Sequence, residues 1–204
     1  MNVDNDRLES FCDGIFGFAI TLLIIEIKIP DFTKAHSASD IWVDLRSQWP
    51  SWFAFGLSFI TLLIAWVNHH NLLKQLDKTS STFIYANGFL ILTVIIFPFS
   101  TSVLGRSINT ELAQPGITLY CLSNLVHAIG WLAISTTATR PKDLSKNVAA
   151  KNKIVETRSV IIKACFANTG IVLLSFWFPV LALSLMTASW VIYLLAGVFK
   201  SSLD

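Results

Sequence analysis

The sequence predicts an all-α integral membrane protein of six transmembrane helices, and three observations lead to this fold class. Hydrophobic residues make up 53% of the 204 residues. Charged residues make up only 14%, against about 25% in soluble domains. Several segments are apolar over the roughly 20 residues that a helix needs to cross the hydrocarbon core of a bilayer. A soluble domain of this size has too little interior to bury so much apolar surface.

Six segments are long and apolar enough to span a membrane, or nearly so. We expect residues 1–204 to form a single transmembrane unit of these six spans. Proline marks three of their ends: Pro30 stops the first span, and Pro50 precedes the second, where proline suits a helix start. Pro179 separates the fifth from the sixth with almost no loop, so these two form either a tight hairpin or one long broken helix. The expected spans are Phe11–Ile29, Trp52–Asn68, Phe83–Leu104, Ile117–Thr137, Ser159–Phe178 and Val180–Phe199.

The basic residues predict the orientation of the bundle, because cytoplasmic loops carry an excess of Lys and Arg. With six spans and the N-terminus inside, the outside holds Lys28, Lys34, Arg46 and Arg106. The inside then holds Arg7, Lys74, Lys78, Arg140, Lys142, Lys146, Lys151, Lys153, Arg158, Lys163 and Lys200. This bias favours an even number of spans with both termini in the cytoplasm.

Two loops are longer than minimal turns. The outside stretch Asp31–Pro50 contains Trp42 and Trp49 among other apolar residues, which predicts a short helix lying at the membrane interface. The inside stretch Arg140–Arg158 is polar and basic, and we expect it to be a solvated linker near anionic headgroups.

Ionisable groups within a span are costly and need partners. Arg7 and Asp13 both belong to the first helix, but at 100° per residue they lie on different faces and do not pair as helix neighbours do. Trp66 and His69 close the second helix at the same predicted depth. We therefore expect a hydrogen-bonded girdle that joins the first three helices through these four residues and Asn87.

Other chemistries receive little support. Adjacent His69 and His70 point about 100° apart on a helix, and the spacing of hydrolytic zinc sites is absent, so we predict neither a metal nor a cofactor. The Ser and Thr residues in the spans have no paired base. We expect the three cysteines, Cys12, Cys121 and Cys165, to be free thiols buried in apolar segments. The small net charge of +2 gives no reason to expect nucleic-acid binding.

An apolar stripe runs along the first helix. Phe18, Leu22, Ile25 and Ile29 follow one another at spacings of four, three and four, which places them on one helical face bordered by Thr21. Packing against lipid or a neighbouring helix accounts for such a stripe without any pore.

The run Arg7-x-x-x-Phe11-Cys12-Asp13, followed by Gly14-Ile15-Phe16-Gly17-Phe18-Ala19-Ile20-Thr21-Leu22-Leu23, resembles the Arg-x-x-x-Phe-Ser-Asp signature of the transmembrane protein 175 family. Trp66-x-x-His69 and Phe97-Pro98 are similar to further family features. The family consists of lysosomal and prokaryotic potassium channels without the usual selectivity filter. Cys12 departs from the family serine, and because a thiol is a weaker donor and acceptor than a hydroxyl, its hydrogen bond should be weaker.

Prokaryotic members of the family carry one six-helix unit per chain and assemble as tetramers. The resemblance therefore implies a homotetramer in the bilayer of a prokaryotic plasma membrane. It also implies that the first helices surround a pore through which potassium permeates. On this view Phe18, Leu22 and Ile25 form the apolar constriction and Thr21 the polar ring. Arg7, Asp13, Trp66 and His69 hold the first helix in place.

Near the outer mouth, Glu26 and Asp31 could concentrate cations, or Glu26 could instead pair with Lys28 or with the interface. Three rival functions stay open at this point. A proton-conducting or proton-coupled protein would relay protons through Asp13, His69 and His127. A membrane enzyme would depend on His127, and a scaffold would carry no flux of any ion.

Overall fold

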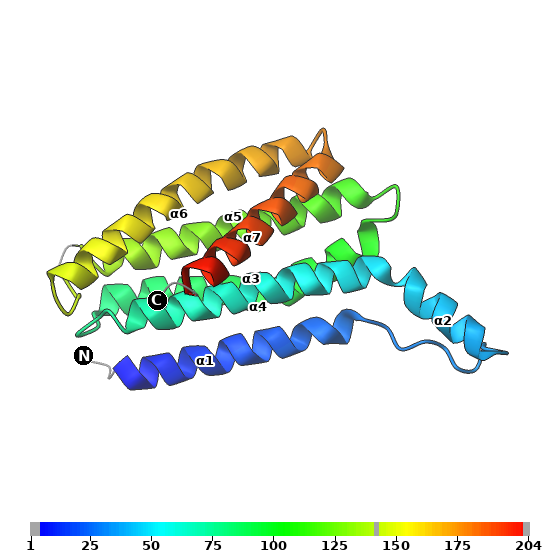
Figure 1. Cartoon of the computed structure of the whole chain (residues 1–204), viewed down its shortest axis with the longest axis horizontal. Coiled ribbons are helices and arrows are strands. Elements are labelled where there is room, and N and C mark those ends of the chain that lie inside the picture. The colour runs from blue at the N-terminus through cyan, green and yellow to red at the C-terminus, as the bar shows by residue number, and fades with distance from the viewer. Residues whose placement is uncertain (1–4, 141–142, 202–204) are drawn as a thin grey trace.

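The computed structural model describes residues 5–140 and 143–201, with the side chains up to residue 195. The described residues are almost entirely helical, and the long helices run side by side (Figure 1). Helix α1 lies at one edge of the bundle beside α3 and α4, and α6 lies at the opposite edge (Figure 1). The elements are α1 Asn5–Leu22, the 3-10 turn η1 Leu23–Glu26, α2 Ala38–Ser47, α3 Trp49–Leu73, α4 Ser81–Ser107, α5 Ala113–Thr137, α6 Val148–Ser175 and α7 Pro179–Ser201.

The all-helical fold class is confirmed. Five helical segments are long and apolar enough to cross a membrane, namely α1 with η1, α3, α4, α5 and α6. The sixth predicted span corresponds to α7, whose apolar stretch with described side chains runs Pro179–Leu195 and is shorter than the other five. A sixth crossing therefore remains a prediction.

The first helix ends earlier than its hydropathy suggests. We predicted a span to Ile29, but the α-helix stops at Leu22, tightens into a 3-10 turn through Glu26, and continues as extended chain. Pro30 disfavours helix for the residue before it, so the helix stops short of the proline. Ile29 is therefore not on the helical stripe, and Ile25 sits in the tighter turn.

Helix α6 begins earlier than predicted. The stretch Arg140–Arg158 was expected to be a linker, but the helix starts at Val148, where the side chain of Asn147 accepts a hydrogen bond from the backbone N–H of Ala150. Such N-cap contacts satisfy a donor that the first turn leaves free. The basic residues that follow therefore extend α6 beyond its apolar stretch.

The proline between the last two spans marks a hairpin. Helix α6 ends at Ser175, α7 starts at Pro179, and α7 folds back against α6 and α5 (Figure 1). The alternative of one long broken helix is thus wrong. Proline at the first helical position has no N–H to satisfy, which explains where α7 begins.

A short helix lies in the loop between α1 and α3, where the sequence predicted one. Ser37 and Asp40 form a capping box that starts α2, and the helix has no buried residue. Trp42 is exposed on it. Helix α2 projects away from the bundle at the end opposite the N-terminus (Figure 1).

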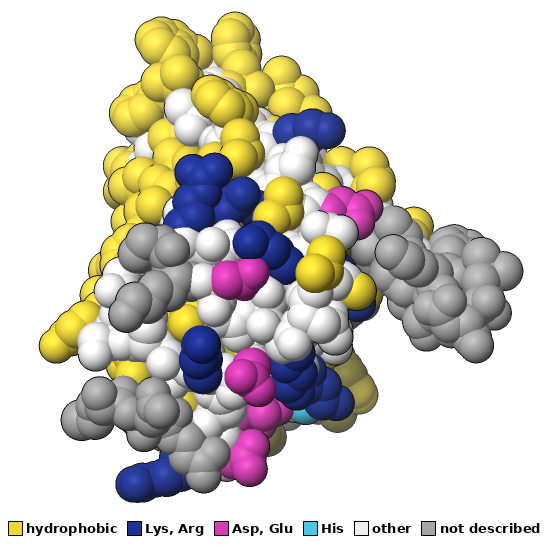
Figure 2. Space-filling model, turned by 90° about the vertical axis from the view of Figure 1, so that its left-hand side faces the viewer, with side chains coloured by type: hydrophobic (Ala, Val, Ile, Leu, Met, Phe, Trp, Pro, Cys, Tyr) yellow, Lys and Arg dark blue, Asp and Glu magenta, His cyan; other side chains and the backbone are white. Residues whose placement is uncertain are grey.

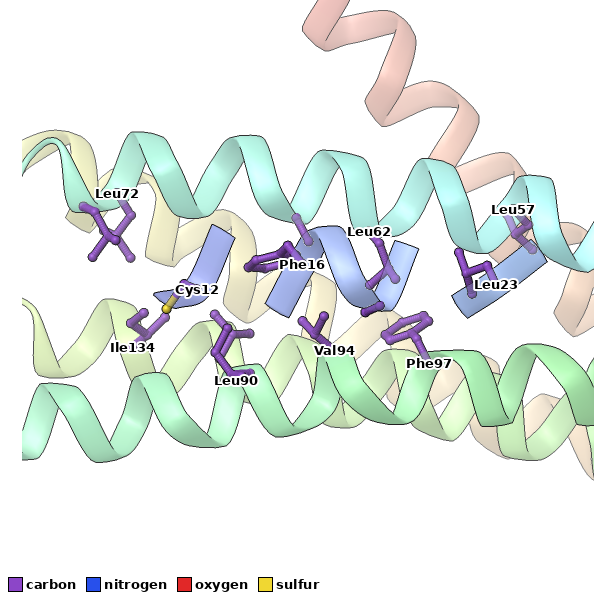
Figure 3. Packing of buried hydrophobic residues seen from close by; sticks show 14 of the residues in the cluster. Cys12, Phe16, Leu23, Leu57, Leu62, Leu72, Leu90, Val94, Phe97 and Ile134 are labelled. Atoms are coloured by element: carbon purple, nitrogen blue, oxygen red, sulfur yellow. The ribbon is translucent and has the colours of Figure 1, made fainter. Parts of the chain in front are cut away.

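The apolar core lies between α1, α3, α4 and α5. Phe16 of α1 and Leu23 of η1 lie among Leu62 of α3 and Val94 and Phe97 of α4 (Figure 3). All five are fully buried. This packing attaches one face of α1 to the bundle.

Small residues let α4 and α5 approach closely, as is common between membrane helices. A Cβ atom placed on Gly130 of α5 would lie 3.1 Å from the Leu90 side chain of α4. At Gly116, near the start of α5, a Cβ atom would lie 1.8 Å from Ser107 Oγ and 3.2 Å from the backbone oxygen of Val103. Side chains at these positions would push the two helices apart.

We expect Gly116→Ala to destabilise the protein by about 1–3 kcal/mol, because the added methyl group overpacks the α4–α5 contact. Thermal unfolding of the purified protein in detergent measures the loss. Gly170→Ala is the matched control, since a Cβ atom there meets none of the described residues within 4 Å beyond its own stretch of helix. Equal melting temperatures for the two variants would contradict the close approach.

Candidate functional site

Helix α1 has one face attached to the bundle and one face free of it. The attached face consists of residues that recur every three or four positions and are buried against α3 and α4, namely Leu8, Cys12, Phe16, Ala19 and Leu23. The free face carries exposed residues at similar spacing, namely Phe11, Gly14, Phe18, Thr21 and Ile25. Within α1 the two sets lie on different sides of a helix of 3.6 residues per turn, and Leu23 and Ile25 continue them in the 3-10 turn η1.

The residues predicted to form the constriction differ in how far their side chains are exposed. Phe18 is 66% exposed and Ile25 is 69% exposed. Leu22 is half-buried, at the boundary between the free and the attached face. Phe18 and Ile25 are therefore open to a partner, and Leu22 also packs within the chain.

Thr21 lies exposed between these apolar residues. Its hydroxyl donates a hydrogen bond to the backbone oxygen of Phe18 at 2.8 Å. The donor is thereby used within the helix, while lone pairs of the hydroxyl oxygen stay available as acceptors. This leaves Thr21 able to contact a cation or a water molecule on the free face.

Part of the predicted girdle is a buried network that joins α1, α3 and α4. The Nε2 atom of His69 contacts the Oδ1 atom of Asn87 at 2.7 Å, and the Nδ2 atom of Asn87 donates to the sulfur of Cys12 at 3.2 Å. All three side chains are buried. Because the amide oxygen only accepts, Nε2 of His69 carries the proton. Nδ1 of His69 is buried and has no hydrogen-bond partner among the described residues.

Asp13 and Trp66 form a second link, closer to the surface of the chain. The indole Nε1 of Trp66 donates to Oδ1 of Asp13 at 2.8 Å. Arg7 is exposed, and its side chain makes no hydrogen bond or ion pair with any described residue. The described hydrogen bonds therefore form two separate links, Asp13–Trp66 and His69–Asn87, and Arg7 takes part in neither within one chain.

The sequence analysis missed a third link at the same end. Nδ1 of His70 contacts Oε1 of Glu9 at 2.5 Å, and the indole ring of Trp66 stacks on the His70 ring with centroids 6.5 Å apart. We had considered His70 only as a metal ligand. Glu9 lies between Arg7 and Asp13 in the sequence and His70 follows His69, and these positions were the signal that could have paired them.

The opposite end of α1 is held by Glu26. Its Oε2 atom accepts hydrogen bonds from Ser102 Oγ at 2.5 Å and from Arg106 Nη2 at 3.1 Å, both on α4. Pairing with Lys28 was one of the alternatives left open for Glu26, and the partner found among the described residues is Arg106 instead. Ser102 and Arg106 are four residues apart at the outside end of the third span, and this spacing could have revealed the site, because such residues share a helix face.

Asp31 is exposed and already engaged in its own loop. It accepts a hydrogen bond from the Thr33 side chain at 2.5 Å and forms an ion pair with Lys34 at 3.1 Å. These contacts, with that of Thr33 the largest, hold the pKa of Asp31 below its usual value. Asp31 therefore stays ionised but has a neighbouring cation that offsets its charge.

His127 lies apart from the girdle, buried between α4 and α5. Its Nε2 atom accepts from the indole N–H of Trp131 at 3.0 Å, and its Nδ1 atom contacts Thr93 Oγ1 at 2.7 Å. The Thr93 hydroxyl also lies 2.6 Å from the backbone oxygen of Leu90, to which it donates. His127 is thus a neutral imidazole with a proton on Nδ1, and both ring nitrogens are occupied. These bonds leave no open position on the ring for a metal ion or a substrate.

Taken together, the fold defines an all-helical integral membrane protein in which one helix is attached by a single face. A sequence profile described as "Endosomal/lysosomal potassium channel TMEM175" matches residues 7–98, which include the α1 signature and the α3 and α4 residues of the network. The chain belongs to the TMEM175 family. This is a family of ion channels and not a family of enzymes.

Three relatives illustrate the likeness. A Chamaesiphon minutus protein named a potassium channel is 38% identical over 117 residues, which cover 57% of each chain. The crystal structure of a lysosomal potassium-selective channel TMEM175 homologue from the same organism superposes with a TM-score of 0.82 at 27% identity, over 94% of this chain and 97% of that one. The human endosomal/lysosomal proton channel TMEM175 is 27% identical over 144 residues, covering 67% of this chain and 28% of the human one.

Proposed function

We propose that this chain forms a homotetrameric, potassium-selective cation channel whose pore is lined by the free face of α1. The observation that carries the proposal is that α1 is attached to its own bundle by one face while Phe18, Thr21 and Ile25 on the other face are uncovered. Symmetric assembly around an axis covers such a face in every copy at once. Relatives named potassium channels support the choice of ion.

The constriction we propose consists of four-fold rings of Phe18, Leu22 and Ile25. A narrow apolar passage excludes water and thereby blocks ions, which is gating by dewetting. The ring of Thr21 hydroxyl oxygens between them supplies polar contacts to a partly dehydrated cation. Selectivity then comes from this ring and not from a filter of backbone carbonyls.

The proposed pore widens toward the cytoplasm. Gly14 and Gly17 lie on exposed positions of α1, and a Cβ atom on either would meet no other residue within 4 Å. Four copies of these glycines would leave more room than the rings of Phe18 and Ile25. We place both termini on the cytoplasmic side of a prokaryotic plasma membrane, in line with the excess of basic residues at that end.

Proton conduction is the second candidate, because the human relative is named a proton channel. A relay through His127 has little support, since both of its ring nitrogens are engaged with Trp131 and Thr93. Nδ1 of His69, in contrast, is buried without a partner among the described residues. His69 is therefore the first histidine to test if protons permeate.

Flux through the purified protein in liposomes tests the function. We expect a potassium gradient without a pH gradient to drive potassium efflux, and a pH gradient without potassium to drive little proton flux. Proton flux without potassium flux would favour the second candidate. Protein that reconstitutes as a tetramer yet carries neither ion would contradict the channel proposal and favour a scaffold.

We expect Asp13→Ala to reduce the fraction of assembled protein more than it changes ion preference. The substitution removes a hydrogen bond between α1 and α3 that involves a charged group, and such bonds contribute about 1.5–3 kcal/mol. Size-exclusion chromatography measures assembly, and flux in potassium and sodium measures preference. Asp44→Ala in α2 is the control, because the Asp44 side chain forms no hydrogen bond or ion pair with α1 among the described residues. A fully assembled Asp13→Ala channel with altered ion preference would contradict this role.

A further inference from the structure

A cavity of about 320 Å³ lies on the far side of the chain from α1. It is lined by residues of α3, α5, α6 and α7. Helix α6 packs mainly against α5 and α7, and the cavity lies between α6 and α3. Its volume lies in the range of about 300–1,000 Å³ that is typical of ligand sites. It plays no part in the proposed pore.

The cavity is amphipathic along its length. On α3 and just beyond it, Asn68, Asn71 and Gln75 follow one another at spacings of three and four and form a polar wall. On α6, Ile161 and Ala164 belong to the apolar lining. The α6 lining runs from Lys153 to Asn168, which corresponds to about 22 Å of helix. The cavity therefore extends from the basic end of the bundle to about the depth of one leaflet.

One unpaired cation stands at the basic end of this cavity. Lys153 is exposed, and its ammonium group makes no ion pair or hydrogen bond with any described residue. Its neighbour Lys151 is already paired with Asp143 at 2.9 Å and does not line the cavity. Among the described residues that line the cavity none is acidic, and Glu156 on the next turn of α6 lies outside the lining. Figure 2 looks onto this end of the molecule, where Lys and Arg side chains lie beside an extended apolar flank.

Unpaired polar groups line the same cavity as that cation. The side chain of Asn71 makes no hydrogen bond with any described residue, and Oε1 of Gln75 is buried without a partner in the part of the chain that the structure describes. The amide of Asn71 can donate to ester or phosphate oxygens, and Lys153 can neutralise a phosphate. We propose that this cavity binds one anionic phospholipid of the inner leaflet, with its headgroup at Lys153 and an acyl chain along α6.

Native mass spectrometry of the purified protein tests the site, with phosphatidylglycerol and phosphatidylcholine of the same acyl chains as probes. We expect one phosphatidylglycerol per subunit, bound more tightly than phosphatidylcholine. Lys153→Gln should lower the affinity for phosphatidylglycerol about fivefold, to the level of phosphatidylcholine, because a basic residue near a membrane surface contributes about that factor toward anionic lipid. Lys151→Gln is the matched control and should leave both affinities unchanged.

Filling the cavity tests the position of the acyl chain. We expect Ala164→Phe to weaken binding of both phospholipids at least tenfold, and Thr157→Phe serves the same purpose if the first variant does not fold. Equal effects of Lys153→Gln and Lys151→Gln, or unchanged lipid binding in the filled variants, would overturn the proposal. Binding of oleate with the same dependence on Lys153, together with no phosphatidylglycerol binding, would assign the site to a free fatty acid instead. None of these readouts depends on ion flux.

Discussion

We expect Ile25→Ala to raise the potassium flux of the reconstituted protein on the order of tenfold and to reduce its preference for potassium over sodium. Ile25 is the more exposed of the two strongly exposed constriction residues, so its truncation widens the proposed pore with little loss of packing within the chain. A tenfold rise requires a barrier lower by about 1.4 kcal/mol, shared among four subunits. Leu22→Ala should raise the flux as well, but because Leu22 is half-buried it should also destabilise the attachment of α1.

Phe166→Ala is the matched control for this experiment. Phe166 is a large apolar residue, 77% exposed on α6 and remote from α1. Its truncation should leave conductance and ion preference unchanged. If Ile25→Ala and Phe166→Ala behave alike in assembled channels, the free face of α1 contacts lipid and the pore lies elsewhere.

We expect Asn87→Leu to lower both the stability of the protein and the attachment of α1 to the bundle. Asn87 is the buried link between His69 of α3 and Cys12 of α1, and leucine leaves the His69 Nε2–H without an acceptor. An unsatisfied buried donor costs about 1–3 kcal/mol. For a chain of this length the loss corresponds to a melting temperature lower by roughly 2–12 °C. Differential scanning fluorimetry in detergent measures it, and assembly should fall in parallel.

Gly88→Ala controls for the position in α4. Gly88 neighbours Asn87, but a Cβ atom there meets no other residue within 4 Å, and alanine favours helix more than glycine does. We therefore expect unchanged or slightly higher stability. A melting temperature of Asn87→Leu equal to that of Gly88→Ala would mean that the network does not stabilise the attachment of α1.

Several features of this protein follow from the sequence by itself. Hydropathy and charge balance determine an all-helical membrane protein, and prolines locate the starts of α3 and α7. The Arg7-to-Asp13 signature identifies the family. Periodicity also places Phe18 and Ile25 on one face of α1. These properties are local, since each depends on residues within one or two helical turns.

The tertiary structure decided which side chains meet across helices. Glu26 binds Arg106 and not Lys28, and His70 binds Glu9, because such partners depend on the depth and rotation of whole helices. The early end of α1 was also decided by the tertiary structure. The chain leaves the helix before Pro30, and Glu26 at this point binds α4. The cavity at Lys153 exists only because α6 stands away from α3, and no single segment encodes that separation.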